Sequence, residues 1–374
     1  LLLPFGQPTA NGNDSIRLSL LTCAPGEEIY SLFGHTAIRY EDPANGIDAV
    51  FNYGLFSFNT PNFIFRFSLG ETDYQLGATD YAHFAAEYAF DGRSVWQQTL
   101  NLSKEEKAEL IRLLQENYRP ENRVYRYNFF YDNCATRPRD KIEESIIGKV
   151  IYPSESQDGS RSFRDIVHQY CKGHPWARFG IDLCIGSEAD RPITQRQMMF
   201  APFYLMDAFA GAQIANDSIQ RPLVSDKALI VDAVSDEEEG GWMPTPLQCS
   251  LLLFILTAAA TIYSLRKRTG LWGVDLVLFG TAGIVGCVLA FLALFSEHPA
   301  VSSNFLLLVF HPGQLLFLPY IIYCVRKGKK CWYLTLNLVV LTLFIVLFPV
   351  IPQRFDFAVV PLALVLLIRS ASNL

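Results

Sequence analysis

Apolar residues form long, nearly uninterrupted stretches only in the C-terminal third of the chain. Five such segments are predicted to span a membrane, at about residues 248–265, 271–295, 304–325, 332–350 and 355–370. An upright helical span needs about 20 apolar residues. The last segment has only 14 residues before Arg369, so it requires a thinner bilayer or a helix that continues past this arginine. The pattern predicts an all-α bundle of about five transmembrane helices over residues 247–374 and excludes a wholly soluble protein.

The third apolar segment has an irregular centre, where Phe310 is followed by His311, Pro312 and Gly313. Proline removes a backbone donor, and carbonyl groups freed within lipid must find other partners. One interpretation is a kinked helix that packs on its neighbours. The other is a broken or re-entrant helix that exposes His311 or Asn304 to a lipid headgroup, since polar groups at membrane depth often mark sites.

The first 246 residues show the shorter alternations of a folded domain with strands and helices. Ser103 and Glu106 form a capping box at the start of one predicted helix. These patterns predict an α+β domain over residues 1–240, and a charged, glycine-containing linker at 236–242 leads into the first span. The predicted strands are 17–22, 31–40, 48–58, 93–102 and 125–131, and the predicted helices are 104–118, 135–147 and 195–215.

Charge divides the chain in the same way. Residues 1–246 carry 22 basic and 34 acidic residues, a net charge of −12, whereas 247–374 carry nine and three, a net charge of +6. The acidic domain disfavours a nucleic-acid partner, because phosphate would repel it. Basic clusters at 266–268 and 326–330 predict cytoplasmic loops, which places the domain and the loop at 296–303 outside and the C-terminus inside. Residues 1–5 resemble the remnant of an export signal.

Cys134 follows a predicted strand and opens a predicted helix. Backbone N–H groups and the helix dipole are expected there to lower the pKa of the thiol and create a nucleophile. The alternative is a buried structural cysteine. Cys171 and Cys184 are candidates for a disulfide in an oxidising compartment, although four exported cysteines allow three pairings. No CxxC or HExxH pattern is present, so neither a metal nor another cofactor is expected.

A thiol nucleophile needs a general base, and His35 in a predicted strand is the leading candidate. A lone strand histidine is more often a structural residue, and the pairing with Cys134 is what favours catalysis. The next strand offers Asn52 and Tyr53, which point to opposite faces, with Asp48 nearer the turn. Asn52 is preferred as the residue that orients the imidazole, because an amide carbonyl does so without a buried charge.

Four motifs together resemble the Lnb family of bacterial lipoprotein N-acyltransferases, and the resemblance covers nearly the whole chain. They are Gly34–Arg39 (GHTAIR), Asn52–Gly54 (NYG), Tyr125–Asn128 (YRYN) and Asn133–Arg137 (NCATR). The resemblance implies a circularly permuted papain-like fold, similar in layout to lecithin:retinol acyltransferases, which explains why His35 precedes Cys134. A second histidine on the strand after His35, present in that related group, is missing here.

The resemblance implies transfer of a fatty acyl chain, through a Cys134 thioester assisted by His35, to the N-terminal amine of a diacylglyceryl-cysteine lipoprotein. The acyl donor is a phospholipid or a lipoprotein, and the location is the bacterial inner membrane with the catalytic domain in the periplasm. Arg137 and Arg139 are candidates for binding a phosphate or headgroup, or for pairing with Asp140 or Glu143. The remaining candidates for contact with substrate or headgroup are Tyr53, Asn133, Arg39, Asn304 and His311.

Two other functions remain open. A membrane-anchored cysteine hydrolase, either a phospholipase or a cell-wall amidase or peptidase, would use the same Cys134 and His35, because water can replace the amine. A membrane bundle favours lipid substrates over cell wall, since a peptidase needs only one anchor. A non-catalytic sensor or scaffold would not need the Cys134 thiol at all.

Overall fold

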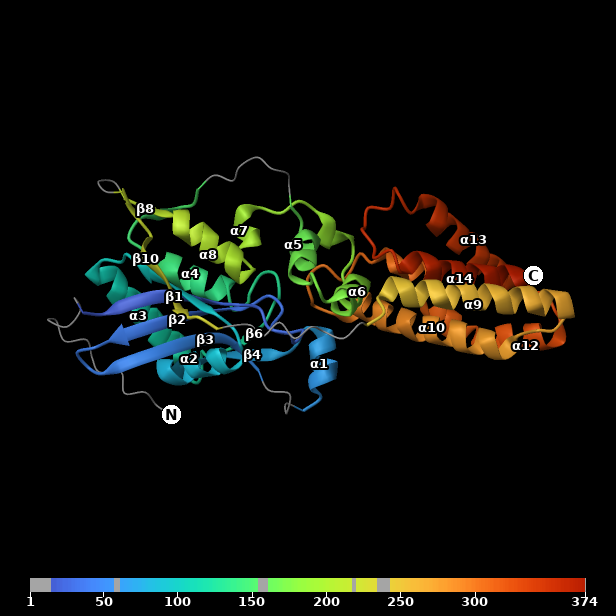
Figure 1. Cartoon of the computed structure of the whole chain (residues 1–374), viewed down its shortest axis with the longest axis horizontal. Helices are drawn as coiled ribbons and strands as arrows, with labels where there is room; N and C mark the ends of the chain where they lie inside the picture. Colours follow the sequence, from blue (N-terminus) through green and yellow to red (C-terminus); the bar gives the residue numbers. More distant parts are fainter. Residues whose placement is uncertain (1–14, 57–60, 154–160, 217–219, 234–242, 374) are drawn as a thin grey trace. The chain divides into compact units, whose positions relative to one another are not determined.

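A computed structural model describes residues 15–56, 61–153, 161–216, 220–233 and 243–373. Residues 1–5, expected to be the remnant of an export signal, and the linker expected at 236–242 lie outside this set. The chain forms two compact units (Figure 1). The first comprises Leu1–Arg161 and Pro192–Glu239, and the second comprises Ser162–Arg191 and Gly240–Leu374.

An antiparallel seven-stranded sheet forms the centre of the first unit. Its strand order is β10-β5-β1-β2-β3-β4-β6. The predicted strands at 17–22, 31–40, 48–58 and 93–102 are confirmed, each with somewhat different ends. The bounds are β1 Arg17–Cys23, β2 His35–Asp42, β3 Ile47–Leu55, β4 Asp73–Asp80, β5 Val95–Leu100, β6 Val124–Arg126 and β10 Val224–Val231.

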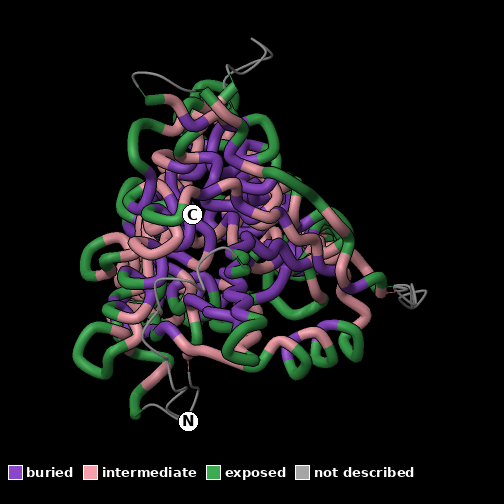
Figure 2. The backbone as a smooth tube through the Cα atoms, turned by 90° about the vertical axis from the view of Figure 1, so that its left-hand side faces the viewer, coloured by how far each residue is buried: buried purple, intermediate pink, exposed green. Residues whose placement is uncertain are grey.

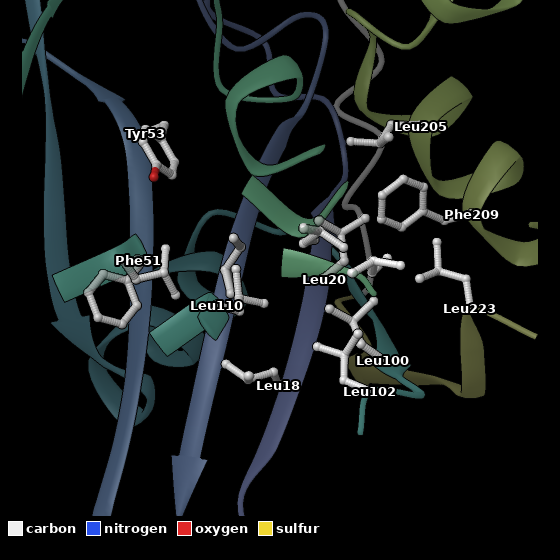
Figure 3. Close-up of a cluster of buried hydrophobic side chains, with 14 of the residues drawn as sticks. Leu18, Leu20, Phe51, Tyr53, Leu100, Leu102, Leu110, Leu205, Phe209 and Leu223 are labelled. Atoms are coloured by element: carbon white, nitrogen blue, oxygen red, sulfur yellow. The ribbon is translucent and has the colours of Figure 1, made fainter. Parts of the chain in front are cut away.

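Helices cover both faces of this sheet. Successive residues of a strand point to opposite faces, so Leu20 and Leu21 of β1 enter different cores. Leu20 packs with Leu110 of α3 and Phe209 of α8, whereas Leu21 packs with Phe84 of α2. Figure 3 shows the larger of these two clusters. The helices are α1 Phe63–Leu69, α2 Tyr81–Phe90, α3 Lys104–Tyr118, α4 Thr136–Ser145, α7 Gln195–Met198 and α8 Pro202–Gly211.

Two expectations for this unit are wrong. The single helix predicted at 195–215 is divided into α7 and α8, because Pro202 begins a new helix and the chain then turns into β8. The aromatic strand predicted at 125–131 ends after Arg126, and the chain then turns where Asn128 pairs with Asp132. A small sheet of β7 Lys149–Ile151, β8 Gln213–Ala215 and β9 Gln220–Pro222 completes the unit.

The second unit is helical. Two of its described helices, α9 Pro246–Lys267 and α10 Trp272–Phe295, are long and apolar enough to span a membrane, and a bent pair would make a third span. The remaining predicted spans correspond to two shorter apolar helices. The other helices are α5 Phe163–Tyr170, α6 Pro175–Cys184, η1 Ser187–Asp190, η2 Phe305–Leu308, α11 Pro312–Leu316, α12 Leu318–Lys327, α13 Trp332–Leu347 and α14 Val359–Ser372.

The irregular third span is a broken helix. The pieces Phe305–Leu316 and Leu318–Lys327 meet at 73°. His311 precedes Pro312, which begins α11, as expected for a proline that cannot continue a helix. Gly283 and Gly286 of α10 let this segment approach, since an added Cβ on Gly286 would lie 2.4 Å from the backbone nitrogen of His311. The prediction that this segment is broken or kinked is confirmed, although the 73° bend lies at Phe317, after the His311–Gly313 stretch that predicted it.

Residues 162–191 belong to the helical unit by their contacts. The buried Arg164 binds Asp182 and Asp190, and Arg354, near the chain's end, binds Asp190 as well. The amide of Gly186 donates to the carbonyl of Ala300 at 2.7 Å.

The burial colours of Figure 2 show buried segments toward the inside and exposed turns at the outside. Sequence patterns predicted a division at 240–247 and did not indicate the insertion of residues 162–191.

Candidate functional site

The hairpin of β2 and β3 brings His35 and Asn52 together. The strands are antiparallel, with Ala37 opposite Asn52, and the Nε2 atom of His35 lies 3.2 Å from the Oδ1 atom of Asn52. Gly34 starts the approach to His35 with a φ of 78°. A Cβ at Gly34 would lie 2.5 Å from the carbonyl oxygen of Cys23, so both its conformation and the available space require glycine.

Asn52 is buried and held by two further contacts. Its Nδ2 group donates to the hydroxyl of Thr79 at 3.2 Å and to the carbonyl of Val50 at 3.4 Å. With the amide donors used in this way, Oδ1 is the atom that accepts the Nε2–H of His35. The Nδ1 atom of His35 is then the unprotonated nitrogen, which is the form that a general base needs.

His35 is held neutral by its surroundings. Burial lowers its pKa, the hydrogen bond that it donates to Asn52 raises it, and the positive charge of Arg93 lowers it, which together bring the pKa to about 4. The imidazole is therefore unprotonated at neutral pH and ready to accept a proton.

Cys134 lies at the turn before α4, partly exposed. Its sulfur accepts hydrogen bonds from the backbone N–H of Thr36 and from the Tyr127 hydroxyl, and its own backbone N–H also favours the thiolate. The contact with Thr36 places the thiol beside the residue that follows His35. These three donors each lower the pKa, but burial has the larger effect and raises it to about 11. The expectation of a lowered thiol pKa is wrong, because the helix terminus acts within a desolvated site.

Two tyrosines and a glycine complete the surroundings of the thiol. Gly54 has a φ of 91°, and a Cβ there would lie 3.5 Å from the Cβ of Cys134, 3.7 Å from Cε2 of Tyr127 and 4.0 Å from the hydroxyl of Tyr125. The Tyr125 hydroxyl is buried and has no hydrogen-bond partner among the described residues. The ring of Tyr127 stacks on Tyr74 with centroids 4.2 Å apart. The Tyr127 hydroxyl therefore donates to the thiol, and the Tyr125 hydroxyl is a second buried donor near Gly54.

Other candidates on the first unit have different surroundings. Tyr53 belongs to the hydrophobic cluster of Figure 3, and its hydroxyl donates to Asn117 at 2.8 Å. Asn133 uses its Oδ1 to accept the amides of Ala135 and Thr136, and its Nδ2 donates to the carbonyls of Phe129 and Phe200. Both side chains are fully engaged in holding the fold, which does not favour the substrate-binding role expected from the sequence.

The arginines form ion pairs. Arg137 makes a bidentate contact with Asp132 and lies over the ring of Tyr125 at 3.5 Å, which keeps it next to the thiol site. Its partner is not Asp140 or Glu143, the residues considered from the sequence. Arg139 does bind Asp140. Arg39 binds Asp48 and Glu41, on the part of β2 that leads away from His35.

The two candidates on the second unit belong to its internal hydrogen bonding. Asn304 donates to the carbonyl of Leu183 at 2.7 Å and accepts the amide of Leu306. The Nε2 atom of His311 lies 3.3 Å from Oδ1 of Asn337. Asn304 thus fastens the 162–191 insertion, and His311 joins the broken span to α13.

Sequence reasoning missed Tyr127, Tyr125 and Thr36 as residues of the site. The aromatic segment 125–131 was visible as a pattern, but nothing in it indicated that one hydroxyl contacts the thiol. All eight cysteines lie within the described residues and all are free thiols, so the Cys171–Cys184 disulfide considered from the sequence is not formed. Among the described residues, no group of three or more His, Cys, Asp or Glu side chains is arranged to hold a metal ion.

Comparison with known proteins gives two matches that together cover most of the chain. The family model for the Lnb N-terminal periplasmic domain matches residues 9–157. The model for the Lnb transmembrane domain, whose name gives it five transmembrane helices, matches residues 237–374. No curated protein and no solved structure gave a significant match. The matches describe a membrane protein with a periplasmic N-terminal domain, and the chain belongs to the Lnb family.

Proposed function

We propose that this protein is a cysteine-dependent acyltransferase that N-acylates the diacylglyceryl-cysteine of bacterial lipoproteins. The observation that carries the proposal is the arrangement around Cys134. Its thiol accepts a hydrogen bond from the N–H of Thr36, the residue that follows His35. His35 is neutral and is oriented by its hydrogen bond with Asn52. A buried thiol and a neutral imidazole fit covalent catalysis on a carbonyl. Family membership and the apolar helices of the second unit support a lipid substrate.

The first half-reaction would form a thioester. The sulfur of Cys134 attacks the carbonyl carbon of a fatty ester while its proton passes to His35. The ester C–O bond then breaks, and the alcohol leaves with the proton from His35. Negative charge that develops on the carbonyl oxygen needs donors, and the proposed ones are the Tyr127 hydroxyl, which contacts the thiol, and the Tyr125 hydroxyl, which lies near Gly54 and has no partner among the described residues.

The second half-reaction would transfer the acyl chain to nitrogen. The N-terminal amine of the lipoprotein attacks the thioester carbonyl, the C–S bond breaks, and His35 carries the proton from the amine to the sulfur. The products are an amide and the free thiol. The stacked rings of Tyr74 and Tyr127 beside the sulfur would exclude water and disfavour hydrolysis.

Three further parts of the proposal concern the fold of the first unit, the orientation of the chain in the membrane and the acyl donor. The order of His35 on a strand before Cys134 at a helix start supports a permuted papain-like fold. The basic loops at 266–268 and 326–330 support an inner-membrane protein with a cytoplasmic C-terminus. The donor is either a phospholipid or a second lipoprotein, because both present the same fatty ester.

The test uses the full chain in detergent with a diacylated lipopeptide and a phospholipid that carries a labelled acyl chain. Mass spectrometry is expected to find the lipopeptide heavier by one acyl group, and a hydroxylamine-sensitive acyl group on the Cys134 peptide. The Cys134→Ala and His35→Ala variants should lose this product, whereas Cys184→Ala, at a free thiol of the second unit, should keep it. A labelled acyl group on the product identifies the phospholipid as the acyl donor, and an unlabelled acyl group identifies the lipopeptide.

Release of free fatty acid without N-acylation would instead identify a hydrolase. Full transfer by Cys134→Ala would exclude both enzymes and leave the non-catalytic function.

A further inference from the structure

The short helix α1 of the first unit exposes nearly all of its apolar surface. It lies between β3 and β4 in the chain (Figure 1), and none of its seven residues is buried. The exposed fractions are 80% for Ile64, 58% for Phe65 and 45% for Phe67. Soluble surfaces rarely gather large apolar side chains in this way, and such patches usually mark an interaction surface.

The rest of α1 is built to hold this surface in place. Asn62 before the helix and Gly70 after it both adopt the left-handed conformation, and the amide of Gly70 donates to the carbonyls of Arg66 and Phe67. The one charged residue, Arg66, is turned back to the domain, where it binds Asp73 at 2.7 Å and the carbonyl of Glu71. The exposed apolar side chains therefore have no competing charge among them.

A column of aromatic rings connects α1 with the nucleophile. The ring of Phe63 stacks on Phe56 at 5.8 Å, Phe56 contacts Tyr74 at 5.1 Å, and Tyr74 stacks on Tyr127 at 4.2 Å. The hydroxyl of Tyr127 in turn donates to the sulfur of Cys134. Aromatic rings packed in this order offer apolar contacts to an alkyl chain, because contact with them removes its methylene groups from water.

We propose that α1 inserts into the bilayer and that the aromatic column leads one acyl chain of a membrane lipid to Cys134. The occupant is lipid because the same chain carries membrane-spanning helices, which keep the first unit beside a bilayer at all times. Aromatic and aliphatic side chains on a helix are the residues that enter the region between headgroups and acyl chains. The insertion of α1 into the bilayer does not depend on the proposed acyl-transfer reaction. The role of the aromatic column in leading an acyl chain to Cys134 rests on that proposed reaction.

The direct test is photocrosslinking in lipid nanodiscs of phosphatidylethanolamine and phosphatidylglycerol. p-Benzoylphenylalanine is placed at position 64 or 65 of the full chain and, as the matched control, at position 90. Phe90 is also an aromatic residue of the first unit and is 92% exposed, but it is on α2. Phospholipid adducts are expected at 64 and 65 and not at 90. Adducts only with peptides of this chain or of a second copy, or equal lipid adducts at 90, would overturn the insertion.

A kinetic test addresses the insertion of α1 and the lipid route that depends on it. Phe65→Asp should raise the KM for bilayer phospholipid on the order of tenfold, because the variant loses the transfer of one aromatic side chain into the bilayer. It should leave kcat and the alkylation rate of Cys134 unchanged, and Phe90→Asp should change none of the three. An unchanged KM in Phe65→Asp would overturn the lipid route. Lipid adducts without any acyl transfer would overturn the proposed reaction while α1 insertion stands.

Discussion

Burial acts in opposite directions on the two groups of the proposed dyad. It raises the pKa of Cys134 to about 11 and lowers that of His35 to about 4. Both groups are therefore neutral at pH 7, and the proton must move from sulfur to nitrogen during the attack itself. The free protein does not hold a ready-made thiolate–imidazolium pair, which sets it apart from cysteine sites with a low thiol pKa.

Alkylation by iodoacetamide should reveal the raised pKa of Cys134. Only the thiolate reacts, so the rate is expected to rise about tenfold for each pH unit from 7 to about 10. Mass spectrometry of the Cys134 peptide measures it. A plateau below pH 9 would contradict the raised pKa. Tyr127→Phe removes a hydrogen bond that lowers this pKa, so the variant should react more slowly at any fixed pH.

Asn52→Asp should move the acidic side of the pH–activity profile. An aspartate beside His35 favours the imidazolium, which raises the pKa of His35 above about 4. The base works only when unprotonated, so activity should be lost at a higher pH as the solution is acidified. The profile of kcat/KM measures this limb. An unshifted limb would show that another group, and not His35, is the base.

At the scale of elements, the position of each strand or helix depends on where its backbone can come close to a neighbouring segment. The β2–β3 hairpin places Asn52 against His35, and Gly34 and Gly54 allow the chain to pass beside Cys23 and Cys134. In the second unit, glycines of α10 do the same for the broken span. The contacts of Gly34 and Gly286 involve backbone atoms, which cannot rotate away as a side chain can, whereas Gly54 faces side chains.

Gly286→Ala should destabilise the second unit. The new Cβ would lie 2.4 Å from the backbone nitrogen of His311, so the broken span must shift, at a cost of about 1–3 kcal/mol. Thermal unfolding in detergent, followed by intrinsic fluorescence, is expected to give a lower Tm. Gly273→Ala is the matched control on the same helix, because a Cβ there meets no atom within 4 Å. Equal Tm values for both variants would contradict the close approach.

The molecule as a whole joins a domain with a thiol site to apolar helices that retain it at a membrane. On the proposed function, such a chain meets substrates that are confined to a bilayer without searching through solution. Its polar anchors in the second unit include a buried ion pair, in which Arg369 of α14 binds Asp275 of α10 at 2.7 Å. Charges at such depth are retained only when paired.

The orientation of the whole molecule makes a separate prediction. Cysteines introduced as Ser302→Cys and Lys329→Cys lie in exposed loops on opposite ends of the predicted spans. In intact spheroplasts an impermeant maleimide should label position 302 and leave 329 unlabelled, with peptide mass spectrometry separating these sites from native cysteines. Permeabilised cells provide the control, in which both are labelled. Labelling only at 329 in intact cells would reverse the proposed topology.

Local patterns were sufficient where one stretch of chain carries its own signal. The capping box of Ser103 and Glu106 gave the helix now seen as α3 with its bounds, and Pro312 indicated that the third span is irregular. His35 and Cys134 were proposed from residue type and motif. The helix expected at 195–215 failed because apolar composition outweighed the signal of Pro202 in the prediction.

The sequence by itself determined the mixed domain of strands and helices and the apolar helices, and it led to the proposal of His35 and Cys134 as a pair, because periodicity, span length and nucleophile chemistry depend on neighbouring residues. Only the tertiary structure decided that Tyr127 and Thr36 donate to the thiol, that residues 162–191 join the helical unit, and that the Cys134 pKa rises. These properties depend on desolvation and on contacts between residues far apart in the chain, and no local pattern records either.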